Sequence, residues 1–123
     1  MRKFEYLTIP ILSREEVELA ISKNDIDKLR VAILSVALYE ADLKFAENIC
    51  VVCSKHEDPG VRGNAILGFG HIARIHRKLD EGKTKLLIEE ALQDADAYVR
   101  EHAESAADDV ELFLSWKLNR PKS

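Results

Sequence analysis

Apolar residues recur along this chain with the spacing of helices. Near the C-terminal end, Val99, Ala103, Ala106, Val110 and Phe113 follow one another at intervals of three or four residues. This period places them on one face of an α-helix. No segment alternates apolar and polar residues over enough positions to predict a sheet. The pattern therefore predicts an all-α fold.

Helix-capping signals divide the pattern into six predicted helices. Ser13 and Glu16 have the spacing of a capping box, and Asp25 is placed to cap the second helix. An apolar lead, Tyr6–Leu12, precedes them. Pro10 keeps this lead from forming a regular helix, and we expect it to dock as an extended cover. The predicted helices cover residues 13–22, 25–40, 42–55, 59–78, 84–93 and 97–116, and residues 80–82 are predicted to form a turn.

One structural unit is written twice. Asp58–Ala65 and Asp96–Ala103 stand thirty-eight residues apart and share Asp, Val, Arg and Ala at the same places. In each copy the Asp can accept backbone N–H bonds as the helix N-cap. Pro59 takes the first helical position, where its missing N–H costs nothing. A repeat of this length predicts a solenoid of stacked helix pairs.

The repeated pattern Asp-x-x-Val-Arg-x-x-Ala resembles the HEAT-like repeats of the phycobilisome-lyase type. The resemblance implies three architectural roles, none of them catalytic, namely helix caps, core positions and braces to the neighbouring repeat. In that order the roles fall on Asp58 and Asp96, Val61 and Val99, and Arg62 and Arg100. We expect one HEAT-like domain over residues 1–123, with clear repeats at about 42–78 and 84–116. A degenerate first repeat covers about 13–40, and its Arg30 lies one place out of register with Arg62.

Composition agrees with one small soluble domain. The chain has 123 residues, of which 46% are hydrophobic and 33% charged, enough to bury a core without disulfide bonds. No apolar run approaches the roughly 18 residues that span a bilayer, and Met1–Tyr6 lacks the apolar stretch of a secretory signal. We expect a cytoplasmic protein that does not bind membranes.

Acidic residues concentrate in the last repeat. Residues 89–111 contain nine acidic side chains and one base, Arg100, a local net charge of −8 in a chain whose net charge is −4. Four of the acids share one stripe of the last predicted helix: Glu101, Glu104, Asp108 and Glu111. Like charges at this spacing destabilise a helix by a few tenths of a kcal/mol each. The stripe is therefore either a solvated face or a docking surface for a basic partner.

Aromatic residues lie beside this acidic stripe on the helical wheel. Tyr98 and Trp116, with Leu112 between them, would supply the anchors that such an interface needs. The alternative is that they pack beneath the fifth helix. The predicted partner-binding residues are Tyr98, Glu101, Glu104, Asp108, Glu111 and Trp116.

The cysteines and histidines predict neither a redox centre nor a metal site. Cys50 and Cys53 match Cys-x-x-Cys, but reactive pairs sit at a helix N-terminus, whereas this pair falls in mid-helix on the apolar stripe. We predict that both are structural and reduced. Zinc would need two further ligands, and His71 and His76 are five residues apart, about 140° around a helix. We expect no metal and no cofactor.

The remaining candidates do not predict catalysis. The basic residues within 74–78 could contact phosphate, but as the last turn of a helix they suit its negative dipole end. Gly63, Gly68 and Gly70 fit close helix approach better than a phosphate loop. The pair Asp108–Asp109 could do acid–base work, but nothing in the sequence suggests a pocket around it. We expect a protein that is not an enzyme.

Three functions stay open. In size and charge the chain resembles the immunity proteins that bacteria pair with secreted toxins, whose toxic domains are often basic nucleases. The prediction we favour is a protein that binds and neutralises such a basic domain. A general HEAT-like scaffold, adaptor or lyase-like subunit is the alternative. Nucleic-acid binding ranks last, because the net charge is −4 and the pI about 5.6.

Overall fold

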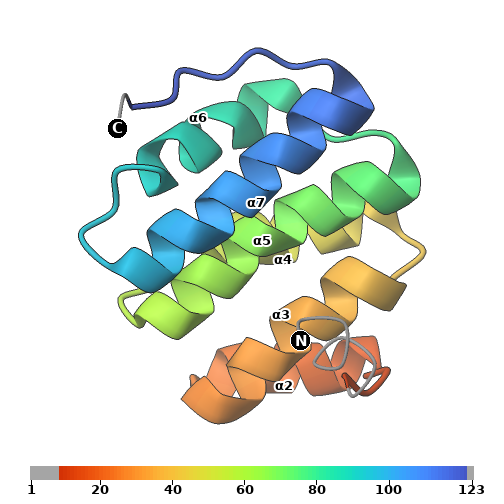
Figure 1. The fold of residues 1–123 in the computed structure, drawn as a ribbon. Helices are drawn as coiled ribbons and strands as arrows, with labels where there is room; N and C mark the ends of the chain where they lie inside the picture. The colour runs from red at the N-terminus through yellow and green to blue at the C-terminus, as the bar shows by residue number, and fades with distance from the viewer. Residues whose placement is uncertain (1–8, 122–123) are drawn as a thin grey trace.

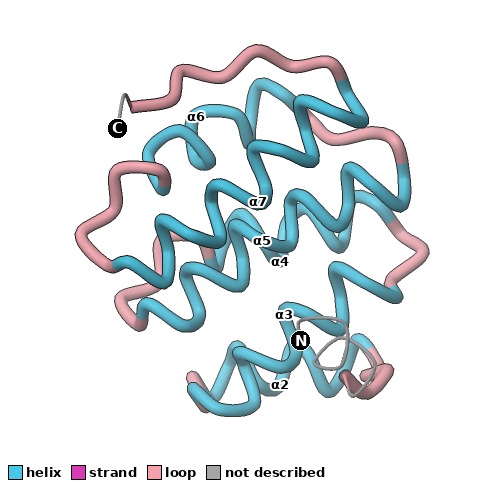
Figure 2. Tube along the Cα trace, viewed as in Figure 1, coloured by secondary structure: helices cyan, strands magenta, loops and turns pink. Residues whose placement is uncertain are grey.

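The structure, a computed structural model of the chain, describes residues 9–121. Six helices and no strand occur among these residues (Figure 2), which confirms the prediction of an all-α fold. Residues 6–8 of the predicted cover, Tyr6–Leu12, lie outside the described residues. The helices are α2 (Arg14–Lys23), α3 (Ile26–Tyr39), α4 (Leu43–Cys53), α5 (Pro59–His76), α6 (Glu81–Ala91) and α7 (Ala97–Leu114).

A capping side chain begins every one of these helices. Ser13 and Glu16 form the predicted capping box at α2. An aspartate caps each of the other five, its carboxylate accepting a backbone N–H two or three residues ahead: Asp25, Asp42, Asp58, Asp80 and Asp96. The prediction of a turn at residues 80–82 is wrong. Asp80 caps α6 by accepting the Lys83 N–H at 3.1 Å, and Gly82 lies in the first turn of that helix.

Left-handed residues end three of the helices. Asn24, Arg77 and Ser115 have φ values of 50°, 55° and 59°, and the Arg77 N–H bonds the carbonyl oxygen of Ala73 at 2.9 Å. This conformation stops a helix and satisfies a terminal carbonyl group. Consequently α5 ends at His76, before the predicted Lys78, and α7 ends before the predicted residue 116.

The helices stack as three pairs in two layers. Contacts join α2 to α3, α4 to α5 and α6 to α7, while α5 lies between α3 and α7 and contacts both. Figure 1 shows α3, α5 and α7 running in the same direction as one layer, with α2, α4 and α6 in the other. The turns that precede α3, α5 and α7 therefore lie along one side of the molecule. We call this side, residues 24–25, 54–58 and 92–96, the N-terminal edge.

Glycines let the neighbouring helices approach α5 closely. A Cβ atom on Gly70 would lie 3.0 Å from the Cα of Ala106 in α7, and one on Gly68 would lie 2.7 Å from the Cys50 Sγ. Both distances are shorter than ordinary van der Waals contacts, the first between two carbon atoms and the second between carbon and sulfur. A Cβ on Gly63 would likewise meet a side chain of α7. The prediction that these three glycines mark close helix contacts is confirmed.

Both cysteines belong to the core. Cys50 and Cys53 are buried and carry free thiols. Burial raises the pKa of the Cys53 thiol to about 11, and the pKa of Cys50 is raised further because it is more deeply buried and lies near Cys53 and Glu47. Neither thiol is activated, which agrees with their predicted structural role.

The two repeat valines behave alike, whereas the two repeat arginines differ. Val61 and Val99 are fully buried, as predicted. Arg62 reaches the next repeat, its Nε and Nη2 donating to the two carboxylate oxygens of Asp94 at 2.8 Å each. Arg100 donates to the backbone carbonyls of residues 94 and 95, at 2.7 and 3.0 Å. Its predicted role as an inter-repeat brace is therefore wrong. It holds the turn before its own helix, as the Nη1 of Arg62 also does for the turn before α5.

We expect Gly68→Val to lower the free energy of unfolding by about 1–3 kcal/mol, because the added methyl groups would overlap the Cys50 side chain in a packed core. Gly82→Ala is the matched control. The only atom near its added Cβ is the Asp80 Oδ1 at 3.4 Å, so we expect a change between zero and about 1 kcal/mol of stabilisation. Urea unfolding measures both. A Gly68→Val protein as stable as the parent would contradict the described packing.

Candidate protein-binding site

The acidic stripe of α7 has two halves in different environments. Glu101 and Glu104 are exposed, and within residues 9–121 neither forms an ion pair. Asp108 and Glu111 both bind Arg120, whose Nη2 lies 2.8 Å from the Asp108 Oδ1 and 2.6 Å from the Glu111 Oε1. The hydrogen bonds that Arg120 donates to Glu111 and Asp108 raise its pKa. The unpaired acids of the stripe therefore lie in the first half of α7.

The segment after α7 carries Arg120 to the stripe. It runs back along α6 (Figure 1), where the Asn119 N–H donates to the Glu89 Oε2 at 2.8 Å. Trp116 and Leu118 are half-buried and pack against the core. Tyr98 lies at the start of α7, whereas Trp116 follows its end. The two predicted anchors therefore do not share one contact patch.

Tyr98 is held in place on α5. Its ring covers Gly63, where a Cβ atom would lie 2.8 Å from the Tyr98 Cδ2. Its hydroxyl donates to the Asn64 Oδ1 at 2.6 Å, and its ring centroid lies 4.1 Å from that of His102. The residue nevertheless keeps 41% of its surface exposed. A rigid, half-exposed aromatic side chain of this kind suits an interface, because little conformational entropy is lost on binding.

Asn64 joins the three inner helices. Besides accepting the bond from Tyr98 of α7, it lies on α5 and donates through Nδ2 to the carbonyl oxygen of Arg30 in α3 at 3.1 Å. It is buried, so these bonds also satisfy its polar atoms. Sequence reasoning missed this residue, and the only signal was a polar side chain within an apolar helical pattern.

Arginine–aspartate pairs link successive repeats along the N-terminal edge. Arg30 donates through Nε and Nη2 to the carboxylate of Asp58 at 3.1 and 3.0 Å. Arg30 thus reaches the next repeat although it is one place out of register with Arg62. Burial pushes the pKa of Asp58 up, but the Val61 N–H and Arg30 outweigh it and hold that pKa below its ordinary value. The hydrogen bond from Arg62 is the main cause that lowers the pKa of Asp94.

A hollow opens on this edge between α3, α5 and α7. Its volume is about 300 Å³, and its lining residues are Arg30, Pro59, Gly60, Asp96 and Tyr98. The Arg30 side chain passes over Gly60, where a Cβ atom would lie 2.4 Å from the Arg30 Nε. The hollow therefore has a backbone floor on α5, an arginine wall from α3, and an aromatic and a carboxylate wall from α7. We call it the edge hollow.

Titratable groups also meet between α5 and α7. Burial, followed by the charges of Arg74 and His102, lowers the pKa of His71 to about 4, so this imidazole is neutral at pH 7. Burial raises the pKa of Asp109 above its ordinary value, with Arg74 opposing and Asp108 adding to that rise. Arg74 bonds the His71 Nδ1 at 3.0 Å. These groups connect the two helices, and sequence reasoning did not foresee that Asp109 would be partly buried.

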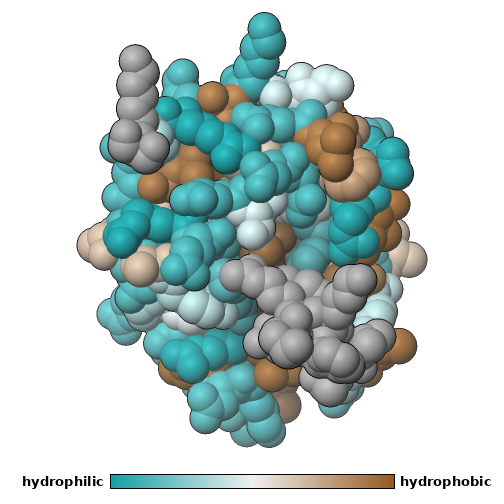
Figure 3. Space-filling view, viewed as in Figure 1, coloured by the Kyte–Doolittle hydropathy of each residue, from teal (hydrophilic) through white to brown (hydrophobic). Residues whose placement is uncertain are grey.

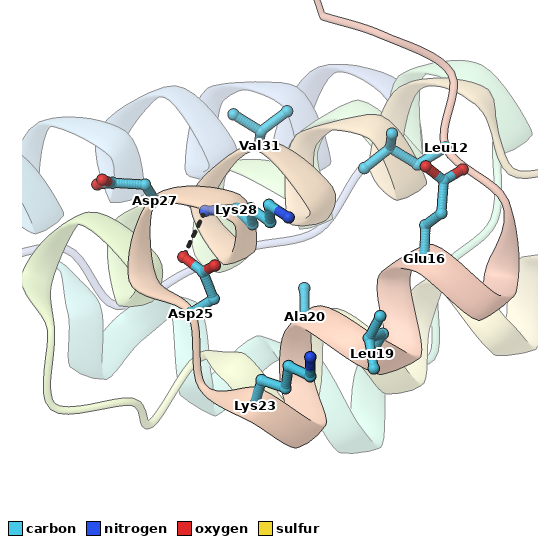
Figure 4. Close-up of a pocket in the computed structure, with 9 residues that line it drawn as sticks. All are labelled: Leu12, Glu16, Leu19, Ala20, Lys23, Asp25, Asp27, Lys28 and Val31. Atoms are coloured by element: carbon cyan, nitrogen blue, oxygen red, sulfur yellow. Dashed lines mark hydrogen bonds between the residues drawn. The ribbon is translucent and has the colours of Figure 1, made fainter.

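A larger cavity than the edge hollow lies elsewhere, between α2 and α3 (Figure 4). Its volume is about 520 Å³. Two of its acids cap helices, since Glu16 completes the capping box of α2 and Asp25 accepts the Lys28 N–H at 3.4 Å. The lining residues, none of them aromatic, are Leu12, Glu16, Leu19, Ala20, Lys23, Asp25, Asp27, Lys28 and Val31. With mixed charges and no aromatic anchor, this cavity does not match the predicted surface for a basic partner.

Residues 9–121 contain no group of three or more His, Cys, Asp or Glu side chains arranged to hold a metal ion. None of their helices combines the length and the apolar character that crossing a bilayer requires.

The fold is similar to that of a solved bacterial protein. A chain in the crystal structure of the CDI (contact-dependent inhibition) complex from Cupriavidus taiwanensis aligns with a TM-score of 0.74 and 22% sequence identity. The alignment covers 85% of this chain and 93% of that chain. No family model matches the sequence, so membership of a HEAT-like family is not confirmed. No curated protein sequence matches it significantly.

We expect the Arg62–Asp94 pair to stabilise the protein in a pH-dependent way. Arg62→Met should lower the free energy of unfolding at pH 7 by about 1–2 kcal/mol, because it removes charge-assisted hydrogen bonds from partly buried side chains. The pKa of Asp94 is lowered in the folded state, so its contribution is complete above the ordinary aspartate pKa of about 4. The difference between parent and variant should stay constant above the ordinary aspartate pKa and shrink as the pH falls through the lowered pKa of Asp94.

Chemical unfolding over this pH range measures the effect. Arg14→Met is the matched control, since Arg14 pairs with Asp42 at 2.8 Å but both side chains are about half exposed, and we expect a smaller change. If the Arg62→Met protein and the parent were equally stable at pH 7, the Arg62–Asp94 pair would not stabilise the stacking of the two repeats.

Proposed function

We propose that this protein is an immunity-type inhibitor that binds a basic toxin domain, such as a nuclease, and blocks it without catalysis. One observation carries the proposal, namely the fold shared with a chain of a contact-dependent inhibition complex over 85% of this chain and 93% of that one. Coverage of nearly the whole of both chains indicates a common architecture rather than one shared motif. In this proposal the three helix pairs form a short HEAT-like solenoid that acts in the cytoplasm, where a toxin would meet its target.

The charge of the surface supports a basic partner. The chain carries a net charge of −4, and Glu101 and Glu104 project from α7 without ion pairs within the described residues. On the face drawn in Figure 3, hydrophilic side chains predominate and the apolar patches are small and separated. Binding through such a face depends on charge complementarity more than on apolar area. Complementary charge speeds association and selects the partner.

The binding surface we propose centres on the first half of α7. There Tyr98 offers a rigid ring beside Glu101, within two turns of Glu104. Asp108 and Glu111 extend the same stripe, but a partner would have to compete with Arg120 for them. Trp116 packs against the core, so its substitution would affect stability as well as any contact with a partner.

Co-expression tests the proposal. If the reading frame next to the gene for this chain encodes a toxic domain, that domain should arrest growth when expressed alone. It should not do so when this chain is expressed with it, and the two should purify as one complex. A neighbouring product that is not toxic, or whose toxicity this chain does not relieve, would contradict the proposal and favour a general scaffold, adaptor or lyase-like subunit.

With the toxin domain in hand, we expect Glu101→Lys combined with Glu104→Lys to slow association about tenfold at low salt. The charge reversal removes electrostatic steering, so the association rate should also depend less on ionic strength. Glu15→Lys combined with Glu18→Lys is the matched control, because it changes the net charge equally at two exposed positions of α2. Binding kinetics on an immobilised partner measure both. If the two double variants slow association equally, the surface on α7 is not the contact.

A further inference from the structure

The two aspartates of the repeated motif differ in one respect. Asp58 caps α5, and its carboxylate also receives a guanidinium group, that of Arg30 from the preceding repeat. Asp96 occupies the same motif position and caps α7 by accepting the Tyr98 N–H at 2.8 Å. Within residues 9–121, no guanidinium group pairs with Asp96. The arginine in the corresponding place, Arg62, binds the carboxylate two residues earlier.

Arg62 cannot serve Asp96 while it makes its present bonds. Its Nε and Nη2 are used by Asp94, and its Nη1 donates to the carbonyl oxygens of residues 56 and 57 at 3.0 Å each. Asp94 also accepts the backbone N–H of Asp96 at 2.9 Å, which fixes the turn. The geometry that braces the two repeats thus leaves Asp96, a lining residue of the edge hollow, without an ion pair within the described residues.

We propose that the edge hollow receives an arginine side chain of the basic protein to which this chain binds. The guanidinium group would donate to the Asp96 carboxylate and lie against the exposed ring of Tyr98. This contact between two proteins would resemble the pair that Arg30 and Asp58 form within this protein. The claim that this arginine comes from a toxin rests on the proposed function. The claim that the hollow binds an arginine side chain does not depend on that function.

The shape and rigidity of the hollow favour a planar group. Its volume of about 300 Å³ suits one long side chain. The Arg30 guanidinium group lies directly on the Gly60 backbone, and Tyr98 is fixed by its bond to Asn64 and its contact with His102. A guanidinium group can stack on an aromatic face while it donates two parallel bonds to a carboxylate. A lysine ammonium group cannot make that bidentate contact, so the hollow should prefer arginine.

The charges around the hollow also favour a cation. The one base in its lining, Arg30, is neutralised by two bonds to Asp58. Asp96 has no ion pair within the described residues, although the charge of Arg62 lies near enough to act on it, and Glu101 adds a second acid further along α7. An anion would meet these acids, and Pro59 offers it no N–H group at the start of α5.

Titration with capped tripeptides tests the proposal without a toxin. The probes are acetyl-Gly-Arg-Gly-amide, its lysine counterpart and its glutamate counterpart, each added to the isotopically labelled full chain. We expect the arginine peptide to shift the backbone amide signals of Gly60, Gly63 and Tyr98 saturably. One side chain makes few contacts, so the dissociation constant should be on the order of 1–10 mM. The lysine peptide should bind at least fivefold more weakly, and the glutamate peptide should cause no saturable shift.

Two variants connect this response to the hollow. Asp96→Asn keeps a good helix cap while it removes the charge, and it should weaken binding of the arginine peptide at least fivefold. Tyr98→Leu removes the aromatic face and should weaken binding by a similar factor. Glu18→Gln is the control, because it neutralises an exposed acid of α2 that lies outside both the hollow and the acidic stripe of α7, and it should change binding less than twofold.

Several results would overturn the proposal. They are the absence of a saturable shift at the hollow, equal binding of the arginine and lysine peptides, saturable binding of the glutamate peptide, or unchanged binding to the Asp96→Asn protein. Co-expression and the titration can fail independently. If the hollow selects arginine but the protein protects against no toxin, the proposed immunity function is wrong and the arginine site stands. If the protein protects against a toxin but the hollow does not select arginine, the immunity function stands and the arginine site is wrong.

Discussion

The close contact between α5 and α7 is the constraint on which the rest of the structure depends. It exists because Gly63 and Gly70 present no side chains to α7, so that Tyr98 and Ala106 pack directly against the α5 backbone. An inner layer this tight brings the starts of α5 and α7 together at the N-terminal edge. There the Tyr98 hydroxyl reaches Asn64. The same contact places Tyr98 and Asp96 of α7 beside Pro59 and Gly60 of α5, and these four residues line the edge hollow together with Arg30.

Carboxylates perform several tasks at the N-terminal edge, and their geometry decides which charges remain for a partner. Asp58 both caps a helix and binds Arg30, and Asp94 both orders a turn and binds Arg62, so these two pairs are internally neutral. Asp96 caps a helix but receives no guanidinium group within the described residues. Two of these three carboxylates are thus engaged in holding successive repeats together. The remaining acids therefore mark where the molecule can still bind a cation.

Much of the fold could be predicted because its signals are local. Caps such as Asp58, the buried Val61 and the helical period depend on neighbours in sequence, and each is confirmed. Helix ends were less certain, since nothing local forces Arg77 into the left-handed conformation that stops α5. The site was the hardest part to predict. That Arg120 would cross to the acidic stripe, or that Asn64 would join α3 to α7, depends on contacts between segments far apart in sequence.

The position of Arg120 changes how the acidity of the last repeat should be understood. Counted along the sequence, the stripe is uniformly negative, and like charges at such spacing work against their own helix. In the fold, the segment after α7 returns a positive charge to the second half of the helix, where Asp108 and Glu111 hold it. Repulsion is relieved there, whereas Glu101 and Glu104 keep their charge exposed to solvent. A basic partner gains most where no internal arginine competes with it, so the free acids direct it to the same end of α7 as the edge hollow.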